Sequence, residues 1–64
     1  MKTTHELLEE RIKAEFLQVR MINEAIAVEM EKPLYHRSDR LLNFLSTEYA
    51  VHVYALAAFQ SMSA

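Results

Sequence analysis

Apolar residues recur along the first half of the chain with the period of an α-helix. One series advances by alternating steps of four and three residues, as in a coiled-coil seam, and comprises Leu8, Ile12, Val19, Ile22 and Ile26, with Glu15 interrupting it. A second series repeats every seven residues and lies roughly 100° or more around the same helix: Leu7, Ala14, Met21 and Val28. The pattern predicts a helix over residues 4–31 with two faces to bury.

The ends of this first helix have their own signals. Thr3 is followed three residues later by Glu6, the spacing of a capping box. Pro33 cannot continue a helix and disfavours helical geometry at Lys32, so a connection over residues 32–38 is expected. The segment 33–37 contains an aromatic residue and no glycine, and could instead form a short strand that pairs with its copy in a second subunit.

The second half of the chain repeats the two-faced pattern. Ser38 or Asp39 is suited to cap a helix that meets no further proline or glycine and is predicted to run over residues 39–61. One seam consists of Leu42, Leu45, Tyr49, Leu56 and Phe59, with His52 inside it. The other runs past Glu48 and consists of Phe44, Val51, Ala55, Ala58 and Met62.

These elements predict an all-α fold: one domain over residues 1–64, folded as an antiparallel two-helix hairpin. Each helix can cover one seam of the other, and the remaining apolar stripes then need a partner. A chain of 64 residues without cysteine cannot compensate with a disulfide. We therefore expect a symmetric homodimer.

Composition and charge exclude several functional classes. The net charge of −2 does not indicate a general nucleic-acid binder. The most apolar stretch, residues 50–59, is about half the ~20 residues that a membrane span needs, so no membrane association is expected. Residues 1–6 lack the apolar core of a secretory signal, so a cytoplasmic location is expected. No nucleophile with a base, glycine-rich loop or paired carboxylates stand at a catalytic spacing, so neither an enzymatic activity nor a cofactor is expected.

Two polar groupings suggest alternative chemistry. Glu48 and His52 are four residues apart and could share a metal, but di-iron bundles use a Glu-x-x-His spacing, so a hydrogen bond at the helix surface is preferred and no metal site is assigned. Lys32, Arg37 and Arg40 form a basic connection beside Tyr35 and His36 that a dimer would double. Nucleic-acid binding through this connection is the alternative function.

The preferred function is the binding of another protein, by an exposed apolar groove that accepts a partner's amphipathic helix. The candidate residues for this groove or for the dimer interface are Phe16, Met21, Val28, Leu34, Tyr35, Phe44, Val51 and Phe59.

The whole chain resembles the small early proteins that lambdoid temperate phages encode between their exonuclease and excisionase genes. The likeness lies in its length, in the opening residues 5–13 (HELLEERIK) and in residues 33–40 (PLYHRSDR). The resemblance implies a dimeric helical accessory factor, not an enzyme, that acts in the host cytoplasm on host or phage proteins to favour lytic development. It offers no site motif that could be transferred to this chain residue by residue.

Overall fold

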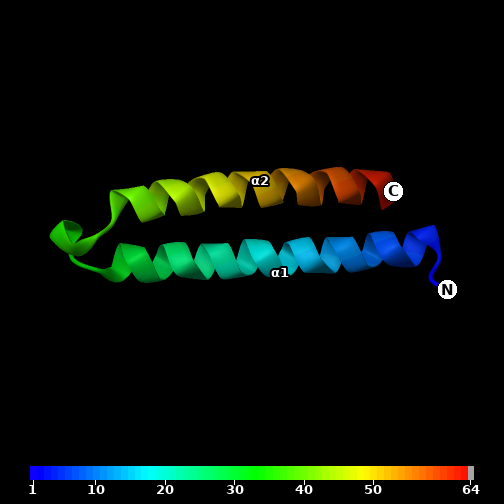
Figure 1. Ribbon diagram of the computed structural model, residues 1–64, viewed down its shortest axis with the longest axis horizontal. Helices are drawn as coiled ribbons and strands as arrows, with labels where there is room; N and C mark the ends of the chain where they lie inside the picture. Colours follow the sequence, from blue (N-terminus) through cyan, green and yellow to red (C-terminus); the bar gives the residue numbers. More distant parts are fainter. Residues whose placement is uncertain (64) are drawn as a thin grey trace.

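Two long helices, α1 (Thr4–Glu31) and α2 (Asp39–Ser63), lie antiparallel in the computed structural model, which describes residues 1–63 (Figure 1). A single 3-10 turn, η1 (Leu34–His36), joins them. The structure confirms the all-α hairpin and the predicted bounds of the first helix, while α2 continues two residues beyond its predicted end. The hairpin is a rod of 51 × 16 × 16 Å, so a large part of its surface faces outward.

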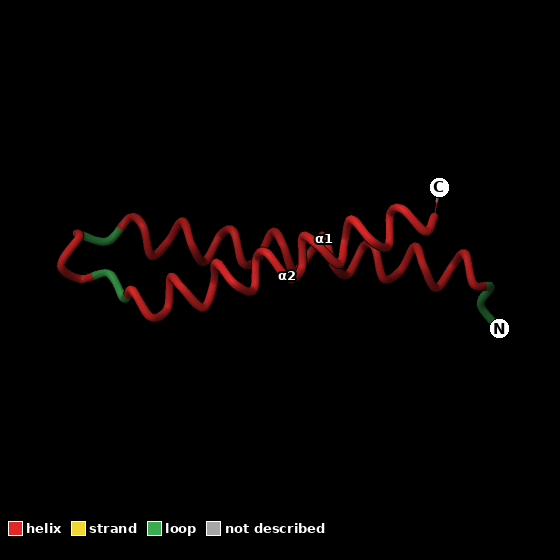
Figure 2. Tube along the Cα trace, turned by 90° about the horizontal axis from the view of Figure 1, so that it is seen from above, coloured by secondary structure: helices red, strands yellow, loops and turns green. Residues whose placement is uncertain are grey.

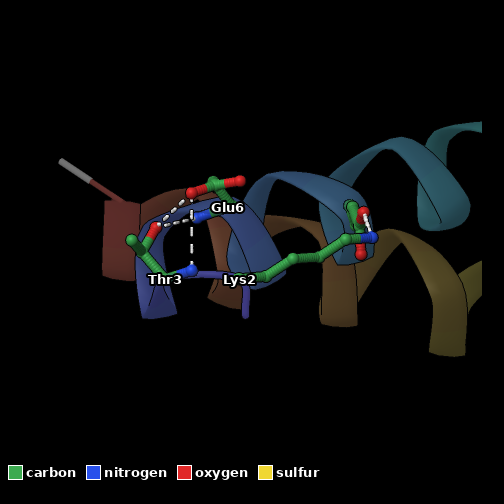
Figure 3. Close-up of polar contacts among 4 residues, drawn as sticks. Lys2, Thr3 and Glu6 are labelled. Carbon is green, nitrogen blue, oxygen red and sulfur yellow. Dashed lines mark hydrogen bonds and ion pairs between the residues drawn. The ribbon is translucent and has the colours of Figure 1, made fainter.

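The capping box at the start of α1 has formed (Figure 3). The backbone N–H of Glu6 donates to Thr3 Oγ1 at 3.1 Å, and the backbone N–H of Thr3 donates to Glu6 Oε1 at 3.4 Å. Lys2 pairs with Glu10 over the next turns of the helix. Two backbone donors that the helix cannot satisfy are thereby satisfied, which fixes where α1 begins.

The connection is helical and not extended, so the prediction of a strand at residues 33–37 is wrong. His36 N–H donates to Pro33 O at 2.8 Å, and Arg37 N–H donates to Leu34 O at 3.3 Å. The flanking residues Lys32 and Arg37 have extended backbone angles. Because its backbone groups bond within the turn, the segment has no need of a second strand.

Ser38, and not Asp39, caps α2. Its Oγ accepts a hydrogen bond from the backbone N–H of Leu41 at 3.1 Å, and its carbonyl accepts one from Leu42 at 2.9 Å. Asp39 occupies the first turn, where its negative charge interacts favourably with the positive end of the helix dipole.

The two helices pack along the predicted seams and cross at a shallow angle when seen from above (Figure 2). Most seam side chains are only half-buried; the members of intermediate exposure include Ile12, Ile22 and Leu45. Within residues 1–63, only Leu56, at 9% exposure, and Glu29, at 3%, are buried. One hairpin therefore has a narrow core, as expected for two helices with a single shared seam.

Candidate interaction surface

One flank of the hairpin carries the surplus apolar side chains of both helices. The position of this flank follows from two contacts: the guanidinium of Arg11 lies 5.5 Å from the centroid of the Phe59 ring, and Glu48 lies beside His52. Phe59 and His52 are one heptad apart on α2 and therefore lie in the same row. Arg11 of α1 contacts one member of this row and Glu48 of α2 contacts the other, so both lie on the side of the seam where this row is.

Apolar residues line this flank on both helices. On α2, some of these residues share the heptad position of Glu48, and the others lie four residues before that position, which is one helical turn away on the same side. On α1, they lie in the row next to that of Arg11. We call this surface the apolar face; its large and exposed members are Leu7, Met21, Val28, Leu41, Phe44, Val51 and Met62.

The opposite flank is more polar. Its large exposed apolar residues are Phe16, Met30 and Val53, interspersed with side chains such as Asn23 and Ser46. Seven large apolar residues against three show that the two flanks differ in character. A partner that covers apolar surface therefore gains more on the apolar face.

The residues predicted for an interface divide among four locations. Met21, Val28, Phe44 and Val51 belong to the apolar face, and Phe16 lies on the opposite flank. Leu34 and Tyr35 are exposed on η1, far from the middle of both flanks. Phe59 is half-buried in the seam beneath Arg11, so it takes part in holding the hairpin together.

A polar cluster crosses the middle of the apolar seam. His52 Nδ1 lies 2.6 Å from Glu15 Oε2 on the other helix, and His52 Nε2 lies 3.4 Å from Glu48 Oε2 on its own helix. We call Glu15, His52 and Glu48 the histidine cluster. Because an ionised carboxylate can only accept, Nδ1 must carry a proton to bond Glu15. The hydrogen bond to Glu15 is the main reason that the pKa of His52 is raised, and the charges of Glu15 and Glu48 add to it against the opposing effect of burial.

A second polar contact lies at the end of the hairpin that contains η1. Glu29 Oε2 accepts from the backbone N–H of Ser38 at 2.8 Å, and Glu29 Oε1 accepts from Lys32 Nζ at 2.9 Å. The hydrogen bond from Lys32, followed by that from Ser38, holds the pKa of Glu29 below its ordinary value. Glu29 thus joins the end of α1, the connection and the start of α2.

These two polar contacts fix one register of the helix pair. Glu15 and Glu29 are two heptads apart on α1, and Ser38 and His52 are two heptads apart in the opposite direction. A slip of one heptad would place Glu15 against Leu45 or Phe59 and leave its charge unpaired in the seam. Glu15 and His52 are recognisable in the sequence as separate interruptions of their seams, whereas the structure shows their pairing and the role of Glu29. Folding the two seams back on one another at Pro33 would have revealed all three residues.

Replacing Glu29 by glutamine is expected to lower the melting temperature at neutral pH. The variant loses the charge that attracts Lys32 and weakens the bond to the Ser38 backbone. Since the pKa of Glu29 is lowered by folding, its contribution is present above the ordinary carboxyl range and is lost as the pH falls through the lowered value. Melting curves of both proteins should therefore converge in acid.

The matched control is Glu31→Gln, two residues further along and exposed. Its effect on the free energy of unfolding should stay within about 0.5 kcal/mol. Equal melting temperatures for the Glu29 and Glu31 variants at neutral pH would contradict the role given to Glu29.

The geometry of the histidine cluster does not suit a metal. The two carboxylates face opposite ring nitrogens, so they cannot join a single nitrogen of His52 around one ion. Over residues 1–63, no group of three or more potential ligands has the arrangement of a metal site.

The basic connection is engaged in its own structure. Arg37 donates from Nε to Lys32 O at 2.9 Å and from Nη2 to Met30 O at 2.7 Å, which satisfies carbonyl groups at the end of α1. Lys32 pairs with Glu29. Of the three predicted nucleic-acid contacts, Lys32 and Arg37 thus have a structural role, and Arg40 lies exposed on the first turn of α2.

Comparison with protein-family models, with curated proteins and with solved structures finds no match for this chain. Neither helix, over the residues that the structure describes, has the length and hydropathy needed to cross a membrane. The candidate site is therefore defined by the surface itself: an apolar face along the hairpin, bordered by the histidine cluster.

Proposed function

We propose that this protein is an accessory factor that acts by binding: it pairs with a second copy through the apolar face and, as a dimer, binds another protein. The observation that carries the proposal is the collection of both helices' surplus apolar side chains on one flank. The proposal assigns this surface to binding and not to catalysis, because its Leu, Val, Phe and Met side chains carry no acid, base or nucleophile.

The exposed area supports a second copy as the occupant of this face. A compact monomer of 7.5 kDa exposes about 4,200 Å², whereas this chain exposes 5214 Å². The excess of about 1,000 Å² is comparable to the ~800 Å² that each partner buries in a stable interface of ordinary size. Two hairpins joined along this flank would form a four-helix bundle with its large apolar residues inside.

In such a dimer the opposite flank remains accessible. Phe16, Met30 and Val53 stay exposed in each copy and offer apolar contacts to an amphipathic helix of the partner, with Met30 able to adapt its shape. The resemblance to early proteins of lambdoid phages favours a host or phage protein as that partner and lytic development as the process. Nucleic-acid binding is less favoured because Lys32 and Arg37 already bond within the connection.

Sedimentation equilibrium at micromolar concentration tests the proposal. We expect a single species of twice the 7.5 kDa chain mass, with helicity that decreases as the dimer is diluted. A stably folded species of 7.5 kDa over the same concentrations would overturn it.

A further inference from the structure

The histidine cluster lies where the seam meets the apolar face. Glu15 and His52 occupy seam positions of α1 and α2, and their side chains are largely shielded, at 13% and 24% exposure. Glu48 shares its heptad row with Leu41 and Met62 of the apolar face. A molecule that covers the face therefore also covers Glu48.

Both ring nitrogens of His52 face a carboxylate. In the charged imidazolium, Nδ1–H and Nε2–H are both donors, so each carboxylate meets an N–H group. In the neutral ring only one nitrogen keeps its proton. If that proton stays on Nδ1 for Glu15, the lone pair of Nε2 points at Glu48, and the attraction becomes repulsion.

The charge balance changes in the same direction. With His52 charged, the histidine cluster carries one net negative charge; with His52 neutral, it carries two carboxylates and no cation. The titratable groups that face His52 are Glu15 from α1 and Glu48 from α2, and Tyr49 lies one turn earlier in the seam. Arg11, one turn before Glu15, places its guanidinium over Phe59.

We propose that the histidine cluster is a proton-dependent switch: protonated His52 holds the two helices in register and favours a covered apolar face, and loss of the proton loosens both. The effect on the covered face rests on the proposed self-association, whereas the effect on the hairpin does not. Histidine is suited to this role because its ordinary pKa of about 6.5 lies close to physiological pH.

The direction with pH follows from linkage. The pKa of His52 is raised in the folded chain by its hydrogen bond to Glu15, so the stabilisation is complete below the ordinary histidine pKa and is lost as the pH rises through the raised value. Between these two values the folding equilibrium constant should fall by up to about tenfold per pH unit. Most Asp and Glu carboxylates keep a constant charge in this range, so the pH dependence arises from the histidines and the α-amino group, and a His52 variant identifies the share of His52.

Melting curves from pH 5.5 to 8.5, recorded by circular dichroism at fixed protein concentration, test the switch in three proteins: the wild-type chain, His52→Gln and His5→Gln. His5 is the matched control because it also pairs with a glutamate, Glu9, at 2.9 Å, but on an exposed surface. We expect the wild-type chain and His5→Gln to lose stability with rising pH along the same curve, and His52→Gln to lose most of this dependence. Equal pH dependence in all three would overturn the switch.

Glu15→Gln guards against a His52 variant that does not fold. The glutamine keeps the shape of the side chain and an acceptor for Nδ1–H but removes the charge, so the pH dependence should again shrink. An NMR titration of the wild-type histidines gives a second readout, in which the His52 pKa should fall on going to Glu15→Gln. An unchanged His52 titration in that variant would also overturn the switch.

The outcomes separate this inference from the proposed function. Sedimentation of the same samples at pH 6 and pH 8 should show weaker association of the wild-type chain at pH 8. A monomer at both pH values, with the pH-dependent melting intact, would contradict the proposed dimer and leave the switch within the hairpin standing. A dimer whose melting does not depend on His52 would support the proposed self-association and contradict the switch.

Discussion

Replacing Phe44 by glutamate is expected to convert the protein to a monomer and to lower its helicity. Phe44 lies on the apolar face with 58% of its surface exposed in one hairpin, so the change leaves the intrachain seam intact. In a dimer it would bury a carboxylate without a partner, which weakens association by at least several kcal/mol. Sedimentation equilibrium of the variant and the wild-type chain at equal concentration measures the effect.

Phe16→Glu is the matched control, since it makes the same chemical change at a residue of similar exposure, 53%, on the opposite flank. We expect it to remain a dimer and to lose the protein that the wild-type dimer captures from a cell lysate. If the Phe16→Glu variant is a monomer and the Phe44→Glu variant remains a dimer, the dimer interface lies on the opposite flank and the proposal is contradicted.

The second large effect is expected in the seam. Leu56→Ala should decrease the free energy of unfolding by about 2–5 kcal/mol, because it removes the most buried apolar side chain of residues 1–63 and leaves a cavity between the helices. Native proteins have a total stability of only about 5–15 kcal/mol, so this loss is a large fraction of the total and should lower the denaturant concentration at the midpoint of unfolding. Urea denaturation followed by circular dichroism provides the measurement.

Leu17→Ala provides the comparison. The substitution is again leucine to alanine, but Leu17 is mostly exposed and points away from α2. Its effect should stay within about 0.5 kcal/mol. Comparable losses in the two variants would show that Leu56 does not lie in the core of the folded state.

The success of the helix predictions has a local cause. The capping box of Thr3 and Glu6, the break at Pro33 and the cap at Ser38 are interactions between residues close in sequence, so the residue types alone reveal them. The connection was harder. The aromatic residue in segment 33–37 permits an extended chain, and the 3-10 turn forms because Arg37 and Glu29 bind the two helix ends around it.

The candidate site was predictable only in its parts. Periodicity showed that each helix has a surplus apolar stripe, and Glu15 and His52 stood out as interruptions of their seams. Phe59 is predicted both for a seam and as an interface candidate, because both flanks and the seam carry apolar residues and composition does not distinguish them; the structure places it in the seam under Arg11. A seam residue and a face residue differ in direction by roughly 100° on the same helix. Only the position of the other helix determines which of the two directions is buried in the seam and which faces outward.

The sequence by itself determined what is local: two helices, their ends, and more apolar surface than one hairpin covers. The tertiary structure decided how the helices face one another, and this placed the surplus of both on one flank, brought Glu15 to His52 and attached Glu29 to the start of α2. The physical reason is range. Helix signals act over three or four residues, whereas a contact between residues 15 and 52 depends on the antiparallel register of two entire helices.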